Sequence, residues 1–158
     1  NLKVAAPAGE FFLAEHTERP VVLLSGGVGL TPMVAMLEAL VNVDADVPVH
    51  YIHGTHNCDT HAMRNHVRDL ATKGRAVQVT DFHQTPLGDE VKGLDYDEAG
   101  IITDEWLVAN TPVAEADYYI CGPRPFLRHA VSTLSLAGVP SDRIHYEFFG
   151  PADELLAA

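Results

Sequence analysis

Hydrophobic runs alternate with amphipathic segments along this chain, beginning with the apolar run Val21–Leu24. An unbroken apolar run of this length is typical of a strand that is buried on both faces. Thr31 is predicted to cap the helix that follows, and Pro32 to occupy its first turn, where a missing N–H costs nothing. The apolar positions of this helix recur on one face: Met33, Met36, Leu37, Leu40 and Val41.

The same alternation continues to the end of the chain. Thr60 and Thr103 are predicted to be the N-caps of two further helices, and a last helix is predicted before Gly138. Residues 81–102 contain glycine, proline and many acidic residues, so a long surface loop is predicted there. Further strands are predicted over residues 48–54, 76–80, 116–121 and 143–148.

Strands that alternate with helices predict right-handed crossovers and an α/β fold, here a five-stranded parallel sheet with helices on both faces. Ligands of such folds bind where the carboxyl ends of the strands meet. Three turns made of small residues follow predicted strands and are expected to converge at that edge: Gly26–Gly29, Gly54-Thr55 and Gly122-Pro123. The pattern therefore predicts one ligand site at this edge of the sheet.

Composition narrows the classes of partner. The 158 residues suffice for a domain with a core, and the formal net charge of −12 argues against binding to nucleic acid or to an anionic membrane. No segment approaches the roughly 20 apolar residues of a membrane span. Cys58 and Cys121 lie far apart in different contexts, so no disulfide framework is predicted and a cytoplasmic location is expected. Nucleotides remain possible ligands, because backbone N–H groups can bind phosphate.

The turn Gly27–Pro32 begins like the dinucleotide fingerprint G-x-G-x-x-G, but Pro32 stands where the third glycine would be. The acidic residue that would hydrogen-bond to an adenosine ribose is also missing. The second strand ends instead in residues 54–57, Gly-Thr-His-Asn. A tight structural turn without a ligand is the alternative interpretation. The position between a buried strand and a helix start favours contact with a phosphate or with nicotinamide.

Cys121 is the second candidate site residue. A thiol at the carboxyl end of a central strand, beside the Gly122-Pro123 turn, could contact a reactive ring. The alternative is a buried cysteine that serves only the core. Together with the glycine turn, the first interpretation is favoured.

Several histidines between residues 50 and 66 raise the question of a metal site. His50 and His53 are three apart, so on a strand they face opposite sides. His61 and His66 are five apart, which on a helix points them in different directions. No H-E-x-x-H sequence or cysteine-paired spacing is present. No metal site is therefore predicted.

Three segments, taken in order, resemble the NAD-binding domain of the ferredoxin-reductase family: Ser25–Pro32, Cys121-Gly122-Pro123 and Tyr146–Pro151. The last of these and the segment His61–Arg64 narrow the resemblance to the C-terminal reductase domain of bacterial flavohemoglobins. Each segment is a weak signal alone, but as an ordered set they are specific.

The opening segment Pro7–Leu13 resembles the end of that family's flavin-binding barrel. Residues 1–18 are therefore interpreted as the tail of an upstream barrel with a linker, and residues 19–158 as the NAD(H)-binding domain. Since the chain begins within this pattern and without methionine, we expect it to be a piece of a longer parent.

The resemblance implies a nitric oxide dioxygenase as the parent. In that family NADH gives a hydride to FAD, which passes electrons singly to heme in an N-terminal globin, where oxygen and nitric oxide become nitrate. The implied partners are the nicotinamide dinucleotide and the FAD-binding and globin domains of the same parent chain. Because this sequence holds neither the main flavin barrel nor the globin, the chain alone is expected to be inactive.

The resemblance also implies roles for individual residues. Glu147 is expected to tune electron transfer, Phe149 to shield the flavin until nicotinamide displaces it, and Cys121 to lie near the reacting ring. An ordinary place in the core is the alternative for Phe148 and Phe149. The implied cofactor-binding residues are Gly26, Gly27, Val28, Gly29, Leu30, Thr31, Pro32, Gly122, Pro123, Phe148, Phe149, Gly150 and Pro151.

Two other functions stay open: the reductase component of a multi-component oxygenase with an iron–sulfur domain, and a non-catalytic nucleotide-binding module. The choice between NADH and NADPH is open as well. No arginine directly follows the second strand to pair with a 2′-phosphate, but Arg64, a turn into the predicted helix, could reach one.

Overall fold

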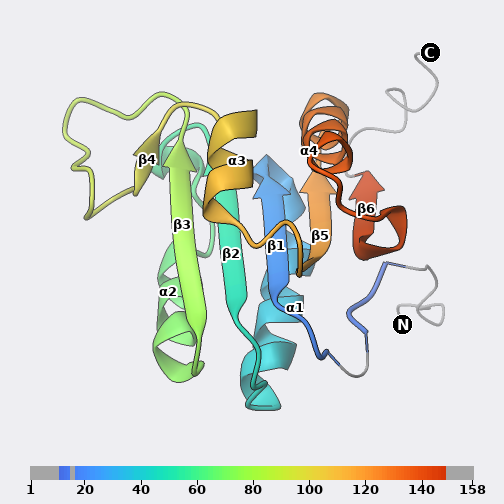
Figure 1. Ribbon diagram of the computed structural model, residues 1–158. Helices are drawn as coiled ribbons and strands as arrows, with labels where there is room; N and C mark the ends of the chain where they lie inside the picture. The colour runs from blue at the N-terminus through green and yellow to red at the C-terminus, as the bar shows by residue number, and fades with distance from the viewer. Residues whose placement is uncertain (1–10, 15–16, 149–158) are drawn as a thin grey trace, which may run out of the picture.

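Six strands form a single parallel sheet in this computed structural model, which describes residues 11–14 and 17–148. The order across the sheet is β4-β3-β2-β1-β5-β6, so β1 lies near its centre (Figure 1). The α/β class predicted from the sequence is confirmed. The strands are β1 Val21–Gly26, β2 Val49–Thr55, β3 Val77–His83, β4 Glu98–Ala99, β5 Asp117–Gly122 and β6 Ile144–Phe148.

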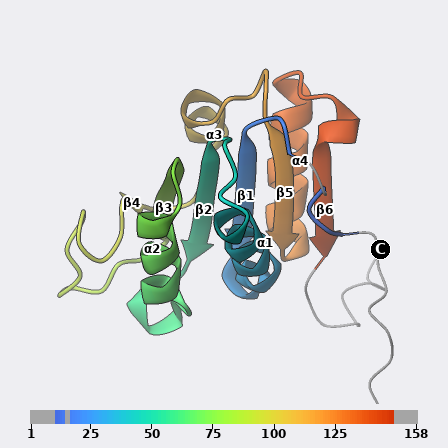
Figure 2. The same ribbon diagram turned by 90° about the horizontal axis from the view of Figure 1, so that it is seen from below.

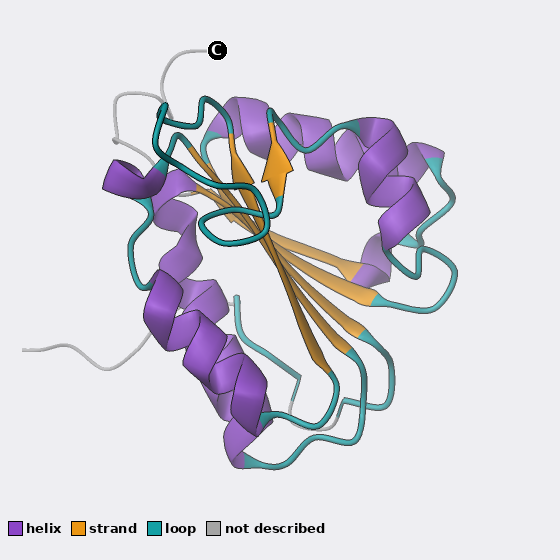
Figure 3. Ribbon diagram, turned by 90° about the vertical axis from the view of Figure 1, so that its left-hand side faces the viewer, coloured by secondary structure: helices purple, strands orange, loops and turns teal. Residues whose placement is uncertain are grey.

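In the part of the chain that the structure describes, four α-helices cover the two faces of the sheet: α1 Leu30–Asn42, α2 Arg64–Lys73, α3 Asp104–Asn110 and α4 Arg124–Leu136. Helices α3 and α4 lie in front of the sheet in Figure 1, and α1 and α2 lie on the opposite face, which is nearer in Figure 2. Figure 3 shows the sheet nearly edge-on between these layers. None of the helices described combines the length and apolar character needed to cross a membrane.

Strand β1 is buried on both faces because its side chains alternate between two cores. Val21 and Leu23 pack with residues of α1 and α2, whereas Val22 and Leu24 pack with residues of α3 and α4. All four side chains are fully buried. A strand in this position needs an apolar residue at every step, which explains the unbroken run in the sequence.

The prediction of five strands is wrong, because β4 lies inside the segment predicted to be a loop. It pairs with β3 only through Phe82↔Glu98 and His83↔Ala99. Strand β3 itself continues to His83, beyond the predicted end at residue 80. A two-residue strand has no hydrophobic period, so only its pairing with β3 reveals it.

The start of α1 differs from the prediction by two residues. The glycine turn forms a 3-10 helix, η1 (Gly27–Gly29), which leads directly into α1. Gly29 is therefore the N-cap, and Thr31 lies in the first turn instead of capping it. Pro32 occupies the first turn, as predicted.

Thr60 does not cap α2. Its side chain closes a capping box with Asn57 around the 3-10 helix η2 (Cys58–Thr60), and α2 begins after Met63, which has a φ of 57°. Thr103 caps α3 as predicted, because its hydroxyl oxygen accepts a hydrogen bond from the Trp106 N–H at 3.2 Å. A third 3-10 helix, η3 (Ser141–Arg143), precedes β6.

The segment before β1 packs against the sheet where it is described. Phe11 and Leu13 contact the core formed with α1, and the Phe11 ring centroid lies 6.3 Å from that of Tyr119. The Ala14 N–H donates a hydrogen bond to the Tyr119 hydroxyl at 3.3 Å. Residues 1–10 lie outside the described residues, so the assignment of residues 1–18 to an upstream barrel stays a prediction.

Candidate functional site

Three turns lie together at the carboxyl edge of the sheet, as predicted. The register places Gly26 opposite Gly54 in β2, and Ser25 opposite Cys121 in β5. The turns that follow β1, β2 and β5 are therefore neighbours. This edge is where open α/β sheets bind their ligands.

A cleft of about 600 Å³ opens over these turns. Its walls are mostly apolar, and among the described residues that line it there is no lysine, arginine, aspartate or glutamate. Volume and lining are both typical of a small-molecule site. An anionic ligand here would be held by backbone N–H groups and histidines, not by an ion pair with arginine or lysine.

Five of the predicted cofactor-binding residues line the cleft: Gly26, Gly27, Val28, Leu30 and Pro123. Four others lie next to it without lining it: Gly29, Thr31, Pro32 and Gly122. Gly29 and Gly122 are buried where the β1 turn meets β5, and Thr31 and Pro32 belong to the first turn of α1.

The start of α1 has features of an anion site. The helix has no side-chain cap at Gly29 and no acidic residue in its first turn. Gly27 has a φ of +53°, and nothing lies within 4 Å of the position that a β-carbon there would occupy. The backbone of the turn therefore faces open space at the positive end of the helix dipole, an arrangement that binds phosphate groups.

Cys121 lies in β5, fully buried, opposite Glu147 of β6. Burial, with a smaller contribution from the Glu147 carboxylate, raises the pKa of the Cys121 thiol to about 11. The thiol is therefore protonated near neutral pH and is a poor nucleophile. Any role for it is one of packing or close contact.

Glu147 is exposed, and Phe148 is half-buried with the Arg124 guanidinium 5.4 Å from its ring centroid. Neither residue lines the cleft, and neither does Cys121. Phe149, Gly150 and Pro151 lie outside the described residues. The roles predicted for all of these residues stay predictions.

Sequence reasoning missed one wall of the cleft, which comes from the end of β3, the segment before α3, and α4. His129 of α4 is fixed there, since its Nε2 lies 2.9 Å from the Ile102 carbonyl oxygen and its Nδ1 lies 3.3 Å from Asp104. The only signal in the sequence was the apolar pair 101–102 before the Thr103 cap. The residues of this wall are Phe82, Gln84, Gly100, Ile101, Ile102, Pro125, Phe126 and His129.

A buried polar network lies between β2, β3 and α2. Asp81 is 2% exposed and accepts hydrogen bonds from Arg68 at 2.6 and 3.1 Å. The Ser25 hydroxyl lies 2.9 Å from His53 Nδ1. Burial lowers the pKa of His53 to about 4, and burial together with the neighbouring His83 lowers that of His61 to about 4. These histidines are therefore neutral at pH 7.

Glu90, in the segment between β3 and β4, joins this network. Although burial opposes the shift, hydrogen bonds from the Cys58 N–H and from His83 lower the pKa of Glu90 to about 2. His50, His53, His61 and His66 belong to no group of three metal-ligating side chains within the described residues. The structure instead brings Cys58, His83 and Glu90 together.

Comparison with known proteins finds similar sequences and structures. Residues 23–132 match the model of the oxidoreductase NAD-binding domain. The chain is 50% identical over 157 residues to the flavohemoprotein of Xylella fastidiosa strain 9a5c, and 42% identical over 154 residues to that of Bacillus cereus strain ATCC 10987 / NRS 248. These matches cover 99% and 98% of this chain but 38% of each relative. The chain therefore spans less than two-fifths of their length.

Solved structures have the same fold. The flavohem-like FAD/NAD-binding domain of nitric oxide dioxygenase from Vibrio cholerae O1 biovar El Tor superimposes with a TM-score of 0.78 at 33% identity, covering 92% of this chain and 57% of that one. The flavohemoglobin of Malassezia yamatoensis, with bound FAD and heme, gives a TM-score of 0.74 at 25% identity. The match covers 87% of this chain and 33% of that one. The ferredoxin reductase in carbazole 1,9a-dioxygenase gives a TM-score of 0.76 at 24% identity, and the match covers 92% of this chain and 42% of that one. The ferredoxin-reductase-type fold is thereby confirmed.

Proposed function

This chain belongs to the oxidoreductase NAD-binding domain family, and we propose that it binds a nicotinamide dinucleotide in the cleft at the carboxyl edge of its sheet. The observation that carries the proposal is the position of this apolar cleft directly over the glycine turn of β1. A dinucleotide needs a flat apolar surface for its rings and hydrogen-bond donors for its pyrophosphate. The cleft offers both.

The residues present fit such a ligand. The N–H groups of η1 and of the first turn of α1 would hold the pyrophosphate without a side-chain cation. Val28 and Ile101, which line the cleft and are largely exposed, would cover a ring. The ring of Phe126 packs over Gly26 and Gly122, because β-carbons at these glycines would lie 3.0 and 2.8 Å from it. This part of the cleft is therefore tightly packed.

We infer that the parent protein is a nitric oxide dioxygenase of the flavohemoprotein type. The flavohemoprotein relatives support this, as does the Malassezia flavohemoglobin with its FAD and heme. In such a parent the bound dinucleotide, FAD and heme would supply the hydride and electron transfer for the oxidation of nitric oxide. This chain binds and orients the dinucleotide, and Glu147, Phe149 and Cys121 are proposed to lie where it meets the flavin.

The cleft favours NADH over NADPH. A 2′-phosphate is usually held by arginine, and no arginine lines the described cleft. Arg64 is engaged elsewhere, since its Nη2 donates to the Leu94 carbonyl oxygen and its Nε lies 3.8 Å from Asp81. We therefore expect tighter binding of NADH.

A thermal-shift titration tests the binding. Millimolar NADH should raise the melting temperature of the chain. The Val28→Asp variant should bind at least about 10-fold more weakly, because its carboxylate would face the phosphate-binding turn and a loss of about 1.4 kcal/mol suffices. Val43→Asp is the matched control, since Val43 is 73% exposed, Val28 is 61% exposed, and Val43 lies at the other end of α1. A melting temperature unchanged by NADH would refute the proposal.

Reduction of the parent tests the electron transfer. NADH should bleach the flavin absorbance of the parent and then reduce its heme, and Phe149→Ala should change the rate of flavin reduction. An iron–sulfur spectrum in place of a heme spectrum would favour the oxygenase reductase. Binding of NADH without bleaching would favour a non-catalytic nucleotide module.

A further inference from the structure

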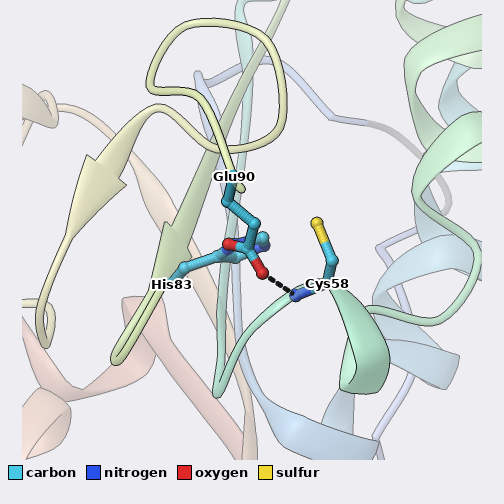
Figure 4. Close-up of side chains that lie close together, drawn as sticks. All are labelled: Cys58, His83 and Glu90. Atoms are coloured by element: carbon cyan, nitrogen blue, oxygen red, sulfur yellow. Dashed lines mark hydrogen bonds and ion pairs between the residues drawn. The ribbon is translucent and has the colours of Figure 1, made fainter. Parts of the chain in front are cut away.

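We propose that Cys58, His83 and Glu90 form a binding site for a zinc-type divalent cation, separate from the nucleotide cleft. The three side chains come from three segments, η2, the end of β3, and the loop between β3 and β4 (Figure 4). Their donor atoms all lie within 4.8 Å of one another. A thiolate, an imidazole and a carboxylate are the ligands that zinc uses in proteins.

The three residues are already held near one another without an ion. A Glu90 carboxylate oxygen, Oε2, lies 2.5 Å from His83 Nδ1, and Oε1 accepts a hydrogen bond from the Cys58 N–H at 2.8 Å. Zinc lies about 2.0–2.2 Å from each oxygen or nitrogen ligand, so two ligand atoms of one ion stand further apart than Glu90 Oε2 and His83 Nδ1 do here. To admit an ion, the Glu90 side chain would therefore have to move away from His83 by about 1 Å. Glu90 stands in a loop, so this movement disturbs no strand.

A chain of close polar contacts leads from these residues into the protein. His83 Nδ1 faces Glu90, His83 Nε2 lies 3.0 Å from His61 Nδ1, and His61 Nε2 lies 3.5 Å from Asp81. Both ring nitrogens of each of these two histidines therefore face a polar partner, so each ring is held in position.

A cation in this site would be bound by Glu90 and by Nδ1 of His83. His83 Nε2–H then donates to His61, and His61 Nε2–H points to Asp81. Asp81 is in turn held by Arg68 at 2.6 Å. Such a chain of hydrogen bonds behind a ligating histidine is the usual support of a protein metal site, since it fixes the tautomer and the ring orientation.

The ion would have a route in from solvent. Cys58 is exposed, whereas His83 is fully buried, so the site is open on one side only. The Cys58 thiol would release its proton to solvent on binding, and water would complete the coordination. The bound ion would tie the loop that carries Glu90 to the edge of the sheet.

Metal titration of the purified chain tests the proposal. After removal of metals, the chain should take up one equivalent of Zn²⁺, measured by elemental analysis after gel filtration, and its melting temperature should rise. Co²⁺ in place of Zn²⁺ should give a thiolate charge-transfer band. Cys58→Ser should abolish this band, although Cys121 remains, and should lower Zn²⁺ affinity at least about 10-fold.

Glu90→Gln and Asp89→Asn form a matched pair, because they remove the same charge from neighbouring positions and only Glu90 is a proposed ligand. Glu90→Gln should weaken Zn²⁺ binding and Asp89→Asn should not. Circular dichroism of the metal-free variants shows whether each one folds. Uptake of no zinc would overturn the proposal, and so would uptake that is the same in Cys58→Ser, which would mean binding by surface histidines.

Discussion

Gly29 lies so close to Cys121 that a β-carbon on it would stand 2.2 Å from the Cys121 carbonyl oxygen. This contact joins the glycine turn after β1 to the end of β5, where the Gly122-Pro123 turn begins. The two turns therefore hold each other in place, and both contribute to the cleft. A side chain at position 29 is excluded by backbone, which has no rotamer by which to move aside.

Gly29→Ala should therefore destabilise the chain by at least about 2 kcal/mol, because the added methyl group can be accommodated only if η1 and the end of β5 move apart. Urea unfolding followed by circular dichroism measures this change. The matched control is Gly88→Ala, since nothing lies within 4 Å of the position of its β-carbon. If the two variants were equally stable, the turn at Gly29 would have room for a methyl group, contrary to the structure.

Asp81→Asn should cost about 2 kcal/mol of unfolding free energy, because it removes the buried carboxylate that accepts two hydrogen bonds from Arg68, while Arg68 keeps its ion pair with Asp97. Asp69→Asn is the control. Asp69 pairs with Lys73 on the surface, where both side chains are more than half exposed, so its loss should cost no more than about 0.5 kcal/mol. Urea unfolding at neutral pH in the presence of a chelator compares them, and a cost below 1 kcal/mol for Asp81→Asn would contradict the assignment.

His53 should make the stability of the chain depend on pH. The folded state lowers its pKa from 6.5 to about 4, so between these values the unfolded state binds more protons. The unfolding free energy that depends on neutral His53 is fully present above pH 6.5. It falls by up to roughly 3 kcal/mol as the pH decreases toward 4. His61, Asp81, His83 and Ser25 surround the ring, and burial is the main cause.

Urea unfolding at several pH values from 7 to 4 measures this dependence. His53→Leu removes the titrating group. The slope of unfolding free energy against pH should therefore fall by an amount that corresponds to as much as one bound proton in this range. The absolute stability of the variant does not enter the comparison, since only the slope is compared. A slope equal to that of the unchanged chain would rule out His53 as a source.

The sequence predicted those features whose residues carry a local signal. The run Val21–Leu24 predicted a central strand because a strand between two cores needs apolar residues on both sides. The three turns were expected at one edge because parallel strands align their carboxyl ends. Thr103 was predicted to be a cap because a hydroxyl before a helix start accepts a backbone N–H.

Features that depend on pairing between distant residues could not be predicted. Strand β4 has two residues and exists only through its register with β3. Cys58, His83 and Glu90 follow no known ligand spacing, and they meet because η2, the end of β3 and the following loop lie together in the fold. His129 carries no signal of its own, because its place in the cleft depends on how α4 packs against the residues before α3.

An arginine at position 56 should shift the preference of the chain from NADH toward NADPH. His56 is exposed, lines the cleft and directly follows β2, where related folds place the group that reads the adenosine ribose. A guanidinium there could pair with a 2′-phosphate, so His56→Arg should raise NADPH affinity relative to NADH by roughly 10-fold, the value of one charge-assisted contact of about 1.4 kcal/mol. His66→Arg is the control, because it adds the same group on α2, outside the described lining of the cleft. Thermal-shift titrations with both nucleotides give the ratio. An equal change in both variants would mean that the added charge acts at long range, and the ribose would then not lie beside His56.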